Sequence, residues 1–69
     1  MKIKLPANAK TRDAENGLNE SVVKISGMLG WDIANKLAAE NGMSILDFCK
    51  ATDVGVYSDH VILDTCYII

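Results

Sequence analysis

The spacing of apolar residues changes along the chain, and both ends have a pattern typical of β-structure. Over residues 1–5, lysine alternates with isoleucine and leucine, which predicts a short half-exposed strand that Pro6 ends. Residues 54–57 and 60–69 are rich in β-branched and aromatic side chains. We therefore expect two further strands there, joined by a turn at Ser58-Asp59.

The spacing in the middle of the chain favours a helix. Over residues 19–41 apolar side chains recur every three or four positions, and Gly30-Trp31 interrupts this stripe, so Asp32 is expected to cap a second helix. A strand over 21–26 is the alternative, because valine and isoleucine are frequent there. The stripe consists of Val22, Ile25, Leu29, Ile33 and Leu37.

The segments on either side of this stretch differ in how clearly their sequences define them. Residues 6–18 are polar and poor in large apolar side chains, which predicts either a loop or a short helix from 8 to 16. By contrast, Ser44 and Asp47 form a capping box, which predicts a helix over 45–51. An Asp-Val-Gly sequence directly after it is expected to end that helix.

The last ten residues are compatible with two structures. One continuous strand over 60–69 would have apolar side chains on both faces, and a second molecule would then have to cover one face. A bend at Asp64-Thr65 would instead turn these side chains inward. On a straight strand, one face would consist of Val61, Leu63, Tyr67 and Ile69, and the other of Ile62, Cys66 and Ile68.

Together these elements predict a single α+β domain over residues 1–69. We expect two or three short helices packed on one face of a two- or three-stranded antiparallel sheet, with a C-terminal hairpin or long strand. The N-terminal strand is expected to pair with one of the C-terminal strands.

A chain of this length buries only about 60% of its unfolded surface, so small domains often need extra stabilisation. Cys49 and Cys66 allow at most one disulfide, and their apolar neighbours are typical of buried thiols. Association with another molecule is therefore the stabilising device that the composition leaves open.

The net charge of −2 is unevenly distributed. Residues 1–30 contain five basic and three acidic side chains, whereas residues 31–69 contain two basic and six acidic ones. An acidic half repels nucleic-acid phosphates and suits a partner with a basic protein surface.

The N-terminus has lysines but no apolar stretch behind them, unlike a secretory signal. No segment approaches the ~20 apolar residues of a membrane span. We therefore expect a cytoplasmic protein without membrane contact, located in the host cell if the protein is viral.

We find no motif for catalysis, a cofactor or a metal. His60 is the only histidine, and its spacing from the two cysteines matches no zinc-ligand motif. The aspartates of the second half stand at predicted caps and turns, where this residue bonds to nearby backbone. The sequence also lacks a glycine-rich phosphate loop. We therefore predict a protein that is not an enzyme and has no cofactor.

Surface contact is the remaining way for such a chain to act. An aromatic side chain at a helix break, aromatics in the C-terminal strands and acidic turns are the expected contact points, because tryptophan and tyrosine often anchor interfaces. The C-terminal strand could also join two copies in a homodimer. The interface candidates are Trp31, Tyr57, Asp59, Ile62, Asp64 and Tyr67.

The sequence thus predicts a small protein-binding module: an inhibitor, adaptor or assembly subunit. Short, acidic, motif-free chains of this kind are common among accessory proteins of viruses and mobile elements, including inhibitors of host defence. The alternative is a small transcriptional regulator, since the element order resembles that of Cro-type helix-turn-helix repressors. Residues 44–51 would then read DNA, but they lack the basic and amide side chains of most reading helices.

Overall fold

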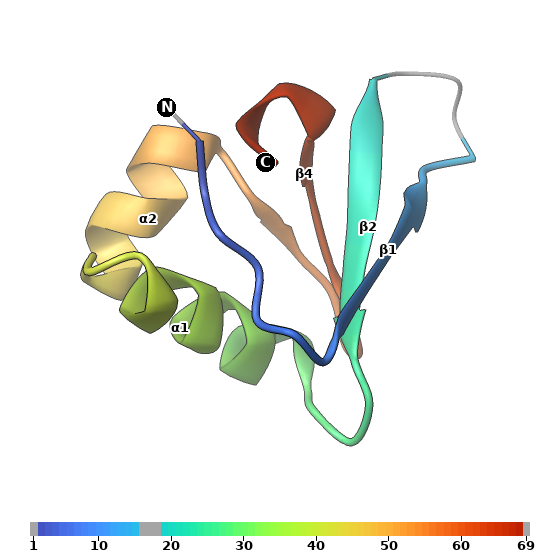
Figure 1. Ribbon diagram of the computed structural model, residues 1–69, viewed down its shortest axis with the longest axis horizontal. Coiled ribbons are helices and arrows are strands. Elements are labelled where there is room, and N and C mark those ends of the chain that lie inside the picture. Colours follow the sequence, from blue (N-terminus) through green and yellow to red (C-terminus); the bar gives the residue numbers. More distant parts are fainter. Residues whose placement is uncertain (1, 16–18, 69) are drawn as a thin grey trace.

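The computed structural model describes residues 2–15 and 19–68, which form two helices on one face of a four-stranded antiparallel sheet (Figure 1). The predicted α+β class is confirmed, but the sheet has four strands where two or three were expected. Its strand order is β1-β2-β4-β3. In chain order the elements are β1 (Ala9–Asp13), β2 (Glu20–Ile25), α1 (Gly30–Glu40), α2 (Ile45–Thr52), β3 (Gly55–Val56), β4 (Val61–Asp64) and the 3₁₀ helix η1 (Thr65–Tyr67).

The central strand β2 occupies the segment where the apolar spacing favoured a helix, so that prediction is wrong and the alternative strand is right. β2 pairs with β1 on one side and with β4 on the other. Val22 and Val23 point to opposite faces of the sheet, and both are buried. Adjacent β-branched residues buried on both faces suit a central strand. Gly27, with a φ of 79°, then turns the chain toward α1.

The edge strand β1 lies where we expected a loop or a helix from 8 to 16. Four of its five side chains are exposed, so no apolar periodicity marks it in the sequence. Pairing with β2 over its whole length determines its extended conformation instead. Residue 16 of the predicted helix lies outside the described residues.

The N-terminal segment runs beside α1 instead of joining the sheet as a strand. Ile3 donates its N–H to the carbonyl of Tyr67 at 2.7 Å and forms an isolated parallel bridge with Ile68. The expected pairing with the C-terminal segment therefore exists only as a single bridge. The side chain of Asn41 joins this segment to the end of α1 through two hydrogen bonds. It accepts one from Lys4 N at 2.8 Å and donates one to Lys4 O at 3.0 Å.

The helix α2 confirms the capping signal in the sequence. The Ser44 hydroxyl accepts a hydrogen bond from the N–H of Asp47 at 3.1 Å. The helix ends where Asp53 takes a left-handed conformation with a φ of 50°. A side-chain cap thus sets the first boundary, and a left-handed residue whose backbone N–H bonds to the carbonyl of Cys49 sets the second.

The C-terminal segment bends after Asp64, so the continuous strand over 60–69 is wrong and the bend is right. The carboxylate of Asp64 accepts from the backbone N–H of Cys66 at 3.1 Å, which opens η1. After the bend, Tyr67 and Ile68 pack partly against the core, whereas Cys66 remains exposed. Ile69 is outside the described residues.

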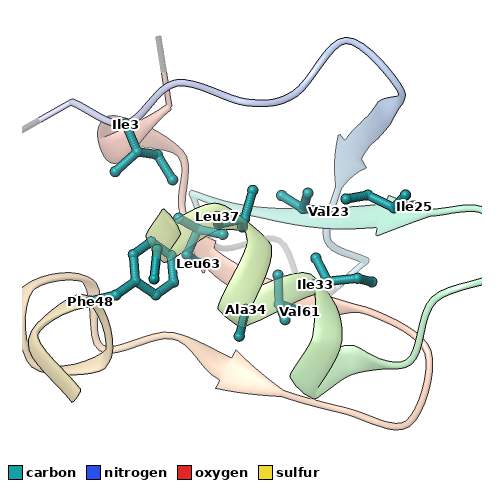
Figure 2. Close-up of a cluster of buried hydrophobic side chains, with 10 residues drawn as sticks. Ile3, Val23, Ile25, Ile33, Ala34, Leu37, Phe48, Val61 and Leu63 are labelled. Carbon is teal, nitrogen blue, oxygen red and sulfur yellow. The ribbon is translucent and has the colours of Figure 1, made fainter. Parts of the chain in front are cut away.

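The core fills the space between α1, α2, the N-terminal segment and one face of the sheet (Figure 2). Phe48 is the largest of its fully buried side chains and is contributed by α2. The other members are Ile3, Val23, Ile25, Ile33, Ala34, Leu37, Ala38, Val61 and Leu63. Because both helices lie on this side, the opposite face of the sheet has no helix over it.

Candidate functional site

The start of α1 approaches the β3–β4 turn at a distance that only glycine permits. Gly30 donates its N–H to the carbonyl of Ser58 at 3.0 Å. A Cβ at this position would lie 1.8 Å from the carbonyl oxygen of Tyr57, far inside van der Waals contact. The helix therefore begins at Gly30, with Leu29 at the N-cap, and the prediction that Asp32 caps it is wrong.

This close approach brings the backbones of three residues with exposed large side chains near one another, while the Tyr57 ring itself lies over Gly55 and stacks on His60. Leu29 and Trp31 flank Gly30 in the chain, and they are 66% and 59% exposed; Tyr57 is 52% exposed. We name Leu29, Trp31 and Tyr57 the end patch. Leu46 is the other large hydrophobic side chain exposed among residues 2–15 and 19–68, and it lies on the first turn of α2, outside the patch.

A chain of polar contacts fixes the turn beside the end patch. The rings of Tyr57 and His60 stack with centroids 4.8 Å apart and planes 5° from parallel. His60 Nδ1 lies 2.7 Å from Asp59 Oδ1, and Asp59 Oδ2 lies 3.1 Å from Lys24 Nζ. The hydrogen bond with His60, followed by the bond and charge of Lys24, lowers the pKa of Asp59 below its ordinary value of 3.8.

We expect the titration of Asp59 to report this network directly. Its side-chain carboxyl carbon, followed by NMR, should titrate with a midpoint below 3.8, and Lys24→Gln should raise that midpoint. Because the folded pKa is depressed, ionised Asp59 stabilises the fold above about pH 4, and this contribution disappears as the pH falls through the folded pKa. The stability difference between wild type and Asp59→Asn should therefore shrink in acid. A wild-type midpoint at or above 3.8 would show that the network does not hold the carboxylate.

The face of the sheet away from the helices carries its charges in rows. Side chains alternate along each strand, so the neighbours of the core residues in β2 and β4 point to this open sheet face. The register arranges these side chains in three rows across the strands. One end row holds Lys10, Lys24, His60 and Tyr57, and Asp59 is bonded there to both Lys24 and His60. The middle row is Arg12, Val22, Ile62 and Gly55, and the acidic row at the other end is Ala14, Glu20 and Asp64.

Two hollows adjoin this face. The smaller, of about 290 Å³, lies over the middle row and includes Arg12, His60 and Ile62 in its walls. The larger, of about 570 Å³, lies at the acidic end and is lined by Glu20 and Asp64 among others. In the part of the chain that the structure describes, no group of three histidine, cysteine, aspartate or glutamate side chains is arranged to hold a metal ion.

The structure does not bring His60 together with a cysteine. His60 precedes β4 and Cys66 follows it, so the strand separates them, while Cys49 lies on α2. Partial desolvation beside Asp64 raises the pKa of the Cys66 thiol, which keeps it protonated at neutral pH and weakens it as a nucleophile.

The six interface candidates from the sequence fall into separate places. Trp31 and Tyr57 lie where α1 meets the β3–β4 turn, Asp59 is bonded to Lys24 and His60, Ile62 lies in the centre of the open sheet face, and Asp64 and Tyr67 lie at its acidic end. Tyr67 packs partly against the core, so it is less available than expected. Leu29 was missed because the sequence assigned it to a buried helical stripe.

The predicted reading helix, residues 44–51, corresponds to α2. Its exposed side chains include Asp47 and Lys50, and Asp53 follows directly at its end. Acidic groups would face DNA phosphates here, and none of the exposed side chains of α2 is an arginine, asparagine or glutamine. This helix therefore gives little support to major-groove reading.

Comparison of the sequence with protein-family models, and of the chain with curated proteins and with solved structures, found no match. Neither α1 nor α2, the α-helices of the described residues, is long and apolar enough to cross a membrane.

Proposed function

We propose that this chain is a protein-binding module that acts by surface contact, as an inhibitor, adaptor or assembly subunit, and that the end patch is its contact surface. The observation that carries the proposal is that Leu29, Trp31 and Tyr57 are all more than half exposed where the start of α1 meets the β3–β4 turn. Contact residues of this kind dominate binding energies because aromatic side chains bury large areas. Covering the exposed part of one tryptophan would contribute roughly 2–3 kcal/mol.

Two features support this surface in particular. The backbone beneath it is fixed by the Gly30–Ser58 hydrogen bond and by the stacked Tyr57 and His60 rings, so little ordering is needed on binding. Asp32 and Asp59 are exposed beside the aromatics. An apolar partner surface with basic groups at its rim would fit this combination.

A photo-crosslinking amino acid placed at residue 31 tests the proposal in the cells that naturally make the protein. We expect it to capture a discrete partner, which then binds the purified wild-type chain in calorimetry and binds Trp31→Ser at least ~10-fold more weakly. The matched control is Leu46, which is equally exposed but outside the end patch, so crosslinking from residue 46 and Leu46→Ser should have no such effect. If the Leu46 variant weakens binding as much as the Trp31 variant, the end patch is not the contact surface.

A further inference from the structure

The outer edge of β1 presents backbone groups that β2 does not use. Ala14 donates its N–H to the carbonyl of Glu20 at 2.9 Å, so the alternation of an antiparallel ladder directs the N–H and carbonyl of Thr11 away from β2. In the described part of the chain β1 is the end strand of the sheet, and no strand lies beyond it in Figure 1. Thr11 is also exposed. A further strand can therefore be added at this edge through backbone hydrogen bonds.

Two basic side chains flank Thr11 on the open sheet face without a partner of their own. Lys10 and Arg12 are exposed, and neither side chain forms an ion pair or hydrogen bond with another residue of the ranges 2–15 and 19–68. Lys24 in the neighbouring strand differs, because its ammonium group lies 3.1 Å from Asp59. The unpaired charges beside Thr11 on this face are therefore both positive.

These charges exclude a second copy of β1 as the added strand. Antiparallel pairing centred on Thr11 would place Lys10 directly opposite Arg12 of the second copy, and like charges in that position are destabilising. A segment with acidic side chains in the same positions would gain two pairs of opposite charge instead. Lysine on an edge strand thus prevents self-association and at the same time favours an acidic strand.

We infer that the edge of β1 binds an extended acidic segment of another protein, which adds a further strand to the sheet. The central residue of that segment pairs with Thr11 through two backbone hydrogen bonds, and its two neighbours lie directly opposite Lys10 and Arg12. Those neighbours are glutamate or aspartate, two positions apart, and they point to the open sheet face. The edge of β1 does not belong to the end patch, so neither surface depends on the other.

The opposite edge of the sheet is a poorer site for an added strand. β3 is only two residues long, Gly55–Val56, and carries no charged side chain. β1 is five residues long and is paired with β2 over its whole length, so its edge is already extended before binding. Main-chain bonds to such a preformed edge supply affinity without a large buried face.

Short peptides with blocked ends test the charge requirement by NMR titration of the whole chain. Thr-Glu-Val-Glu-Thr should shift the amide signals of residues 9–13 with a dissociation constant of roughly 1 mM, whereas Thr-Lys-Val-Lys-Thr should bind at least ~5-fold more weakly. At about ten times the dissociation constant, the glutamate peptide should also slow hydrogen exchange of the Thr11 amide by roughly 10-fold, because β2 leaves this N–H without an acceptor.

Methylation of single peptide nitrogens separates strand addition from simple charge attraction. A methyl group on the valine nitrogen of the glutamate peptide blocks the bond to the Thr11 carbonyl, so it should weaken binding at least ~10-fold. A methyl group on the first glutamate nitrogen, which points away from β1, is the matched control and should change binding by less than about 2-fold. If both methylated peptides bind alike, no strand is added at this edge.

Charge reversal in the protein provides the complementary test. Lys10→Glu/Arg12→Glu should prefer the lysine peptide, whereas Lys36→Glu/Lys50→Glu, with the same net charge but its changes on the helices, should still prefer the glutamate peptide. A misfolded variant cannot exchange its preference in this way, so the switch separates a charge effect from a folding defect. Trp31→Ser should bind the peptide like wild type, which keeps this test independent of the end patch. The inference is overturned if wild type binds neither peptide at about 10 mM, binds both equally, or shows shifts centred outside residues 9–13.

Discussion

Replacing Gly30 with alanine should destabilise the protein by about 2 kcal/mol or more. Helix propensity alone predicts the opposite sign, because alanine is about 1 kcal/mol better than glycine in a helix. However, the new methyl group would lie 1.8 Å from Tyr57 O and 2.8 Å from His60 O, and backbone atoms cannot move aside as a flexible side chain can. The chain must shift by an ångström or more, which strains the packing and breaks the Gly30–Ser58 hydrogen bond, together costing about 2–4 kcal/mol.

Thermal unfolding followed by circular dichroism would measure this effect, and a domain of this size should lose roughly 10 °C in Tm. Gly42→Ala is the matched control. Position 42 has a φ of 67° but no atom within 4 Å of an added Cβ, so only the backbone term of about 1 kcal/mol applies. Gly30→Ala should therefore be clearly the less stable of the two. A Gly30→Ala protein at least as stable as wild type would mean that the contact between α1 and the β3–β4 turn is loose.

The same contact explains why the end patch could be predicted only in part. Trp31 and Tyr57 were predicted because aromatics at breaks and strand ends are often contact residues. Leu29 was missed because its spacing from Ile33 matches a helical stripe, whereas Leu29 is the N-cap residue of α1 and has an extended backbone with a ψ of 159°. The turn at Gly27 separates Val22 and Ile25 from Ile33 in the same way, so spacing across it carries no information on a shared face.

How well each element could be predicted depends on whether its own sequence or its pairing with neighbouring strands determines its conformation. β1 has almost no apolar side chains, so pairing with β2 determines its extended conformation. A local sequence pattern does not reveal such pairing. β2 has valine and isoleucine at positions that satisfy both a helical and an extended pattern, and its neighbours on both sides decide the outcome. By contrast, α2 has a side-chain cap at Ser44, and the capping box predicted both this cap and the helix.

The rows of the open sheet face depend on long-range register. Glu20 and Asp64 are far apart in the sequence, and they share a row only because β2 and β4 pair with that alignment. A shift of one residue would move Ile62 into the core and Leu63 onto the open face, so burial of Leu63 fixes the register and with it the charge pattern.

The second large effect is expected for Phe48→Ala, which should cost about 3–5 kcal/mol. The total stability of a domain of this length is about 3–10 kcal/mol, so the variant should be largely unfolded in mild denaturant. Phe48 is 0% exposed, and on α2 the only other buried side chain is Thr52. Removing the ring therefore removes the main contact of α2 with the core shown in Figure 2, and only partly buried side chains such as Ile45 still join them.

Urea unfolding and amide hydrogen exchange together test whether one ring holds α2 in place. Phe48→Leu, which fills most of the space, should cost about 1–1.5 kcal/mol, and Leu46→Ala, exposed on the same helix, should change stability by less than about 0.5 kcal/mol. In Phe48→Leu the amides of α2 should lose protection before those of β2, because β2 is paired on both sides whereas α2 depends on one ring. Equal loss of protection in both elements would mean that the helix and the sheet unfold as one cooperative unit. Binding at the end patch would then depend on the same equilibrium as global folding.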